Sequence, residues 1–255
     1  MWHKSCVYLL YAQHKEENKL SKLIGVLGGM GPMASQLFYK YVTEMTDSTC
    51  DQDHLQMLIY SDCEMPDRTT AILSGEYSAL YDRILKNAKT LEECNCDAIT
   101  ITCNTAHFFA DLIKDKLEIP IIHMISETCS EIASNFPDSN VGILATDGTI
   151  QTGLYQKQLS KCGLNPYTLE NSIQKEVMHQ IYDCVKSSLP YDEISWQKIE
   201  NALKEAGCDC AILACTELSV IGNENCLDDF YIDPMRVLAK KAILFSGKKL
   251  KPDYK

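Results

Sequence analysis

Two stretches of the chain share one pattern of polar and apolar positions. Residues 96–103 and 208–215 each open with Cys-Asp, continue through mostly apolar positions and end on a second cysteine. Each apolar run has the length and composition of a strand buried inside a parallel sheet. Residues suited to the start of a helix follow at once, namely Asn104, Thr105 and Thr216. The pattern therefore predicts that the second cysteine of each stretch lies at the carboxyl end of a strand.

Further landmarks repeat at similar separations in the two halves of the chain. Gly25 lies 78 residues before Cys103, and Gly142 lies 73 residues before Cys215, with both glycines inside apolar runs. Such a repeat indicates a duplicated α/β unit. We therefore predict an α/β fold of two pseudo-symmetric lobes, each a short parallel sheet flanked by helices. Strand ends would bring Cys103 and Cys215 to opposite walls of one cleft, the place where open α/β sheets bind ligands.

The remaining pattern predicts the other elements and the extent of each lobe. Strands are predicted at 23–27, 55–60, 119–124, 141–145 and 230–233. Helices are predicted at 33–45, 80–94, 104–117, 126–135, 153–162, 177–186, 196–206 and 235–245. We assign residues 22–125 to the first lobe and 126–233 to the second. We expect the C-terminal helix, within 234–255, to pack back on the first lobe.

The first 21 residues look like an addition to this fold. Positions 6–12 are apolar, but the run is only seven residues long. Charged residues follow it at 15–17, and no small-residue cleavage site is present. We expect residues 1–21 to form an N-terminal arm or an extra helix in preference to a signal peptide.

Composition and charge exclude several classes of partner. The chain has 255 residues, of which 45% are hydrophobic, and this is enough for a large buried core. A net charge of −11 argues against nucleic acid and anionic membranes as partners, and no stretch approaches the length of a membrane span. Thirteen cysteines, an odd number, favour a cytoplasmic chain in which most of them serve as small buried hydrophobic residues.

Two other motifs raise ligand hypotheses that their spacing disfavours. In Cys94–Cys96 and Cys208–Cys210 a single residue separates the cysteines, whereas zinc knuckles have two, and no histidine follows at ligand spacing. The glycine-rich turn at 29–34 fits a dinucleotide fingerprint. However, the acidic residue after the next strand, Asp62, lies beyond the expected spacing of about 20 residues. We predict no metal, and expect this turn to suit a small anion such as a carboxylate.

Two thiols on opposite walls of a cleft are able to invert a carbon stereocentre. A thiolate on one face removes a proton from the carbon, and a thiol on the other face returns one, so the pair titrates as a unit. His107, four residues after Cys103, raises the alternative of a nucleophile with a histidine base, although packing is the commoner fate of such a residue. Arg68 is predicted at the same sheet edge as Cys103, where the alternative is a surface ion pair.

Four motifs together resemble the cofactor-independent aspartate/glutamate racemase family. They are Gly25–Pro32, Pro66–Thr69, Cys103–His107 and Cys215–Glu217, and the resemblance covers about residues 22–245. The resemblance implies two α/β lobes, no cofactor, no metal, a small acidic amino acid as substrate, and a homodimer. One departure is His123, which stands where the family usually carries an aspartate and where the second lobe has Asp233.

Carried over residue by residue, the resemblance implies a set of site residues. Cys103 and Cys215 are the two catalytic bases. Arg68 and Lys186 match positions that hold carboxylates. The remaining substrate contacts are Met30, Asn104, Thr105, Ala106, Thr146, Thr216 and Glu217.

We therefore predict an amino-acid racemase that interconverts L- and D-aspartate or L- and D-glutamate. Two alternatives stay open: another two-cysteine reaction, such as isomerisation or decarboxylation of a dicarboxylic acid, and a non-catalytic protein that binds acidic ligands. Arg68 and Lys186 together favour a substrate with two carboxylates over a hydantoin, which has none. One methylene of pocket depth separates aspartate from glutamate, so the choice between them also stays open.

Overall fold

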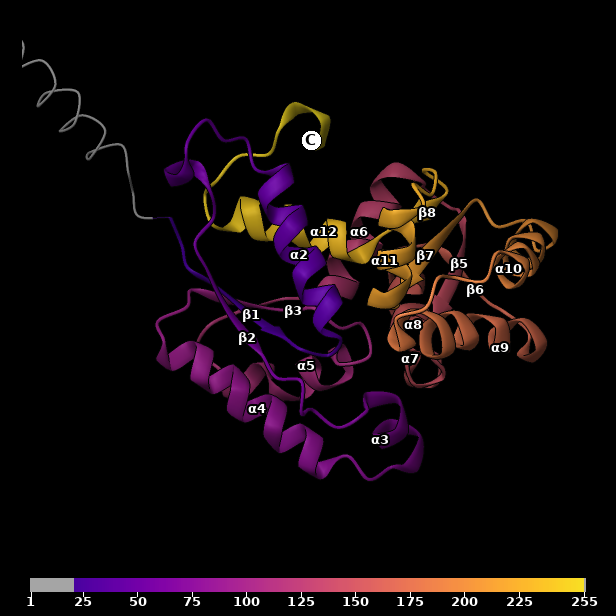
Figure 1. Cartoon of the computed structure of the whole chain (residues 1–255), viewed down its shortest axis with the longest axis horizontal. Helices are drawn as coiled ribbons and strands as arrows, with labels where there is room; N and C mark the ends of the chain where they lie inside the picture. The colour runs from indigo at the N-terminus through magenta and orange to yellow at the C-terminus, as the bar shows by residue number, and fades with distance from the viewer. Residues whose placement is uncertain (1–20, 255) are drawn as a thin grey trace, which may run out of the picture.

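Two four-stranded parallel sheets organise the chain in this computed structural model, which describes residues 21–254 (Figure 1). The N-terminal extension predicted at 1–21 lies, apart from Ser21, outside the described residues. The first sheet has the order β2-β1-β3-β4 and contains β1 (Ile24–Gly28), β2 (Met57–Ser61), β3 (Ala98–Ile101) and β4 (Ile121–Ile122). The second has the order β6-β5-β7-β8 and contains β5 (Asn140–Ala145), β6 (Asn165–Thr168), β7 (Cys210–Ala214) and β8 (Tyr231–Ile232). The matching orders confirm an α/β fold of two similar lobes.

Helices flank both sheets. Those of the first half are α2 (Pro32–Met45), α3 (Arg68–Ser74), α4 (Ser78–Glu93) and α5 (His107–Ile113). Those of the second half are α6 (Met124–Asn135), α7 (Asp147–Thr152), α8 (Leu154–Lys161), α9 (Asn171–His179), α10 (Glu193–Glu205), α11 (Thr216–Glu224) and α12 (Pro234–Phe245). Figure 1 shows α2 and α12 on one side of the first sheet and α4 on the other.

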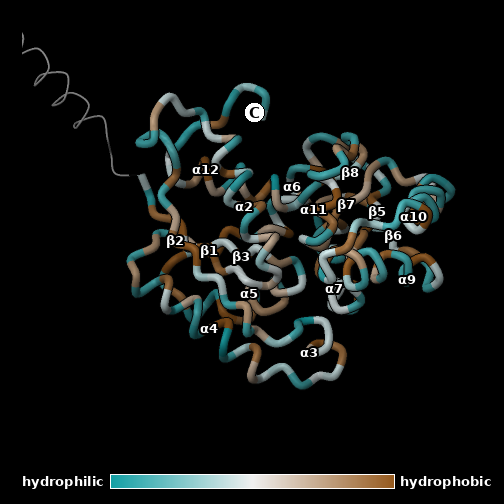
Figure 2. Tube along the Cα trace, in the orientation of Figure 1, coloured by the Kyte–Doolittle hydropathy of each residue, from teal (hydrophilic) through white to brown (hydrophobic). Residues whose placement is uncertain are grey.

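The first sheet is buried on both faces because neighbouring residues of a strand point in opposite directions. Val26 of β1 lies in one apolar cluster with Phe38 of α2 and Leu238 of α12, whereas Leu27 lies in another with Ile84 of α4. Figure 2 shows the strands of the first sheet as largely hydrophobic segments, with mixed hydropathy along outer helices such as α4 and α10. The C-terminal helix α12 therefore contributes to the core beside β1, while the exact lobe boundaries at 22–125 and 126–233 stay a prediction.

The structure differs from the predicted elements in three places. The short strand β6 escaped prediction because Asn165–Thr168 is polar and contains a proline. The helix predicted at 153–162 is α8, but an unpredicted helix, α7, precedes it and is separated from it by Gly153, whose φ of 66° lies in the left-handed region. The helix predicted at 177–186 is α9 followed by a π-helical turn at Gln180–Cys184 and a 3₁₀ turn at Val185–Ser187.

Two further observations concern the described part of the chain as a whole. All twelve cysteines within it are free thiols, and no group of three or more His, Cys, Asp or Glu side chains there is arranged to hold a metal ion. None of the helices between residues 21 and 254 combines the length and the apolar composition needed to span a membrane.

Candidate active site

Loops at the carboxyl ends of four strands line one pocket. Met30 follows β1, Cys103 follows β3, Thr146 follows β5 and Cys215 follows β7. Strands of a parallel sheet end at one common edge, so the two sheets deliver these residues to a shared space. The free volume between these residues is about 10 Å³, room for about one water molecule, so the pocket is closed around the two thiols. Its lining consists of Met30, Asp67, Arg68, Thr69, Cys103, Asn104, Thr105, Thr146, Tyr182, Lys186, Cys215, Thr216 and Glu217.

All of the predicted site residues except Ala106 line this pocket. Ala106 is fully buried in the apolar cluster beneath α5, where it packs with residues such as Phe109. Its backbone is already helical, because it is the residue directly before α5, and its methyl group belongs to the core of the lobe. The Ala106 side chain therefore does not contact a ligand in the pocket.

Arg68 provides positive charge beside Cys103. Burial opposes the charge of the Arg68 guanidinium, but the nearby Cys103, Asp67 and Glu217 favour it, and the pKa of Arg68 is raised. One guanidinium nitrogen donates to the carbonyl oxygen of Pro66 at 3.1 Å. The buried Nε of Arg68 has no hydrogen-bond partner among residues 21–254. A buried donor without a partner is rare in proteins, so this nitrogen is suited to an acceptor supplied by a ligand.

Cys215 lies in different electrostatic surroundings. Its sulfur donates to Oε2 of Glu217 at 2.9 Å, and the other carboxylate oxygen of Glu217 accepts from Nζ of Lys186. Burial, together with the negative charge of Glu217, raises the pKa of the Cys215 thiol well above its ordinary value, against an opposing effect of Lys186. Cys103 and Cys215 thus occupy equivalent places in the repeat, but one faces a cation and the other a carboxylate.

Hydroxyl groups from both halves of the chain join across the pocket. Oγ1 of Thr105 lies 3.1 Å from Oγ1 of Thr146 and 2.8 Å from Oγ1 of Thr149. The hydroxyl of Tyr155, on α8, donates to Oδ1 of Asn104 at 2.6 Å. This bond fixes the Asn104 amide and leaves its buried Nδ2 as a second donor that has no partner within the described chain.

Helix α3 covers the pocket and contacts the opposite lobe. Asp67 caps α3 by accepting from the backbone N–H of Thr70, and it also accepts from the hydroxyl of Tyr182 at 3.2 Å. At Gly148 in α7, a Cβ atom would lie 2.8 Å from Cα of Thr69, so a side chain larger than hydrogen would push α3 away. These contacts close the cleft above Cys103 and Cys215, and only 5% of the first residue and 6% of the second are exposed.

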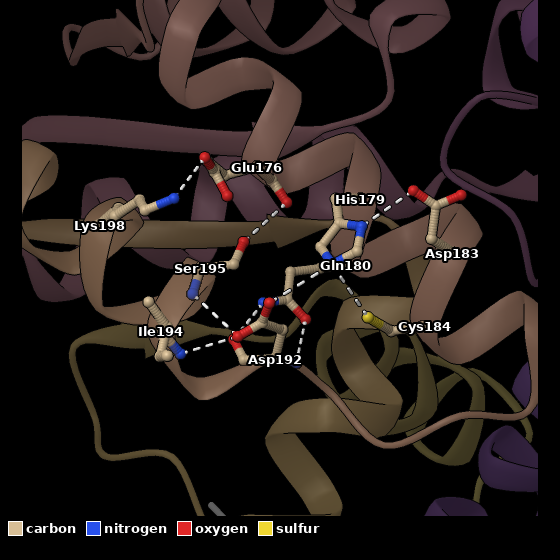
Figure 3. Close-up of polar contacts among 9 residues, drawn as sticks. All are labelled: Glu176, His179, Gln180, Asp183, Cys184, Asp192, Ile194, Ser195 and Lys198. Atoms are coloured by element: carbon tan, nitrogen blue, oxygen red, sulfur yellow. Dashed lines mark hydrogen bonds and ion pairs between the residues drawn. The ribbon is translucent and has the colours of Figure 1, made fainter.

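The π-helical and 3₁₀ turns after α9 bring Tyr182 and Lys186 into the pocket. A polar network on the outer side of this segment fixes it to α10 (Figure 3). His179 contacts Asp183 at 2.9 Å, and its other ring nitrogen lies 3.5 Å from Asp192. The Gln180 side chain bonds to the backbone N–H and carbonyl of Asp192. The segment is thus held from outside while its other side delivers two pocket residues.

Comparison with known families identifies the class of protein. A family model described as Asp/Glu/hydantoin racemase matches residues 27–242, which is most of the chain. The chain belongs to the Asp/Glu/hydantoin racemase family. The match includes the second sheet, the first sheet except the start of β1, and every residue that lines the pocket. Membership in this family supports racemase chemistry, so the protein is an enzyme of the isomerase class.

Individual members of the racemase family resemble the chain over most of its length. A broad-specificity amino-acid racemase of Bacillus subtilis, RacX, is 27% identical over 227 residues, covering 87% of this chain and 96% of that protein. The structure of an aspartate racemase from Picrophilus torridus is 31% identical with a TM-score of 0.78, covering 91% of this chain and 97% of the other. A glutamate racemase of Francisella tularensis, solved in complex with D-glutamate, has a TM-score of 0.64 at 21% identity over 89% of this chain and 82% of the other, and shows the shared fold.

The racemase-family pocket also contains three residues that sequence reasoning missed, Asp67, Thr69 and Tyr182. Asp67 and Thr69 flank Arg68. Pro66 indicated a turn after the second strand, so the sequence already predicted this loop at the sheet edge where the pocket lies. Tyr182 precedes Lys186 by four residues, a spacing that puts two side chains on one helical face. That spacing was the available signal for Tyr182.

Proposed function

We propose that the protein is an amino-acid racemase that acts on aspartate or glutamate through Cys103 and Cys215, without a cofactor. The observation that carries the proposal is the pair of buried thiols, which line one pocket from equivalent strand ends of two similar sheets. The pocket would have to open to admit a small amino acid, and its polar lining suits one. The backbone N–H groups of the loops and the hydroxyl network supply further hydrogen bonds to a polar ligand.

The two cations support an acidic substrate. Arg68 and Lys186 both line the pocket, so each is available to one carboxylate of a dicarboxylic amino acid. The donors without protein partners, Nε of Arg68 and Nδ2 of Asn104, support the same assignment because carboxylate oxygens accept two or more hydrogen bonds each. On binding, a substrate carboxylate would take the place of Glu217 as the ion-pair partner of Lys186.

The proposed reaction exchanges one proton for another. A thiolate on one side takes the α-proton and becomes a thiol, leaving a carbanion on the substrate. The thiol on the opposite side then donates its proton to the other face of the carbanion and becomes a thiolate. The product is the enantiomer, and the charge states of Cys103 and Cys215 have been exchanged. Arg68 is placed to stabilise negative charge near Cys103, and Glu217 to stabilise the protonated form of Cys215.

Incubation with single enantiomers tests this function. The purified protein is supplied with the L- and D-forms of a panel of amino acids in D2O, without pyridoxal phosphate or metal, and the products are separated by chiral chromatography with mass detection. We expect aspartate or glutamate to invert, with deuterium entering the product enantiomer. Release of CO₂ from a dicarboxylic acid would favour the alternative two-cysteine reaction, and binding without turnover would favour a ligand-binding protein.

The homodimer implied by the family resemblance stays a prediction. Strand β2 supports it, because this strand lies at the edge of the first sheet and carries Leu58, Ile59 and Tyr60 with 37–39% of each residue exposed. Exposed apolar residues on an unpaired strand edge favour association with another chain.

A further inference from the structure

His107 does not serve as a base in the pocket. It is fully buried and does not belong to the pocket lining, although it follows Cys103 by only four residues. Burial, with a smaller contribution from the nearby His123, lowers the pKa of His107 to about 3. The imidazole is therefore neutral around pH 7, and its role must come from the bonds that a neutral ring makes.

The His107 ring connects the loop that carries Cys103 to the start of α6. Its Nδ1 lies 2.8 Å from the carbonyl oxygen of Cys103, and its Nε2 lies 3.1 Å from the backbone nitrogen of Met124. A carbonyl only accepts and a backbone N–H only donates, so Nδ1 carries the proton and Nε2 accepts. One tautomer alone satisfies both bonds, which fixes the orientation of the ring.

The second lobe secures its cysteine in another way. Helix α11 begins directly after Cys215, and the carbonyl of Cys215 accepts from two backbone N–H groups of its first turn, at 2.9 and 3.3 Å. Helix α5 begins only at His107, whose own N–H bonds to Asn104 at 3.0 Å. The start of the helix is thus displaced along the chain, and the imidazole occupies the place that a backbone N–H has in the second lobe. Without it, a buried carbonyl would lose its partner, which is costly.

A counterpart of His107 exists in the second lobe. Ser219 follows Cys215 by four residues and donates to Oδ1 of Asp233 at 2.7 Å, while the same oxygen accepts from the backbone N–H of Met235 at 2.9 Å. Both lobes therefore join the helix after the cysteine to the helix after the next strand. The first lobe does so with an imidazole and the second with a hydroxyl and a carboxylate.

We propose that His107 is a positioning residue that holds the Cys103 backbone, and thereby the direction of its sulfur, through the hydrogen bond from Nδ1. The Ser219 hydroxyl and Asp233 join α11 to α12 without a bond to Cys215, whose carbonyl is held by the backbone of α11. This inference rests on the proposed racemase function. It has a specific consequence, because His107 serves only one thiol and each thiol serves one face of the substrate.

Enantiomer-specific half-reactions separate this role from a general effect on folding. An analogue of the substrate with a leaving group on Cβ eliminates once one base has removed its α-proton, so each enantiomer reports on one thiol. The Cys215→Ser variant shows which enantiomer depends on Cys103. The test then compares His107→Gln, which loses the donor at the Nδ1 position, with His107→Asn, whose amide nitrogen stands near that position, and with Ser219→Ala.

We expect His107→Gln to lower kcat for the enantiomer that depends on Cys103 by about tenfold or more, because proton transfer is sensitive to small displacements. The other enantiomer should stay within about twofold of the wild-type rate. His107→Asn should restore most of the loss. Ser219→Ala is the control, because it keeps the backbone bonds to the carbonyl of Cys215, and it should lower the rate for neither enantiomer selectively.

Equal losses for both enantiomers, or no loss in His107→Gln, would overturn the inference. If the Gln variant does not fold, the Asn variant decides: a rate lowered equally for both enantiomers is again a contradiction. A wild-type protein that neither racemises nor eliminates would instead count against the proposed function, so the two failures are distinguishable.

Discussion

At the scale of single residues, the pocket combines symmetry of position with asymmetry of charge. Cys103 and Cys215 are related by the repeat, yet Arg68 stands beside the first and Glu217 beside the second. A two-base reaction needs one sulfur to carry the proton while the other does not. Glu217 favours the protonated form of Cys215 before any substrate enters. In the proposed reaction one sulfur would gain the α-proton while the other gives its own proton to the carbanion, so the difference would reverse during each turnover.

Arg68→Ala should lower kcat/KM for aspartate or glutamate by about 10- to 100-fold, since a charged hydrogen bond contributes about 1.5–3 kcal/mol. Arg68→Lys should recover part of the loss, because a lysine keeps the charge without the two parallel donors. The matched control is Lys114→Ala, which removes an exposed cation paired with Asp111 outside the pocket. Steady-state kinetics of all three variants provide the measurement, and a similar loss in Lys114→Ala would remove Arg68 from the site.

At the scale of elements, periodicity predicted most strands and helices, since long apolar runs and capping residues mark them clearly. It failed where tertiary contacts decide the backbone. The turns at Gln180–Ser187 depend on hydrogen bonds between the Gln180 side chain and the backbone of Asp192, twelve residues later. A local sequence pattern does not predict such bonds. Most of the site was predictable because its residues follow strands or sit in recognisable loops, and Lys186 was identified through the family resemblance. Tyr182 enters the pocket, together with Lys186, through those irregular turns.

Strand β2 is joined to α4 by a carboxylate that makes stability depend on pH. Asp62 accepts from Arg83 at 2.6 and 2.7 Å and from Asn87 at 2.7 Å. The bonds from Arg83, chiefly, lower the pKa of Asp62 to about 2. Arg83 is thus part of a two-pronged ion pair with a buried partner.

The stabilisation from Asp62 should be fully present above the unfolded pKa of about 3.9 and lost as the pH falls towards 2. Asp62→Asn should lower the free energy of unfolding at pH 7 by about 1–2 kcal/mol, a value reduced by the partial exposure of Arg83. The difference between variant and wild type should shrink in acid. Urea unfolding at pH 7 and pH 3 measures it, with the exposed Asp229→Asn as control. A difference that is independent of pH would contradict this interpretation.

At the scale of the whole molecule, the two lobes meet over a closed pocket. The hydrogen bond between Asp67 and Tyr182 and the contact of Thr69 with Gly148 connect them above the thiols. In the proposed reaction an amino acid would enter when α3 separates from α7 and from the turns after α9. Closure would then exclude water from the carbanion and protect it from protons that do not come from the two cysteines.

The central claim is that the two cysteines act on opposite faces of one substrate. Its most direct test is elimination from each enantiomer of a β-leaving-group analogue by Cys103→Ser and by Cys215→Ser. Each variant should racemise the normal substrate about 10²–10⁴-fold more slowly than wild type, because a hydroxyl is a far weaker base at neutral pH. Each should still eliminate from one enantiomer, and the two variants should prefer opposite enantiomers. The same preference in both variants, or a wild-type rate of racemisation in either, would contradict the account.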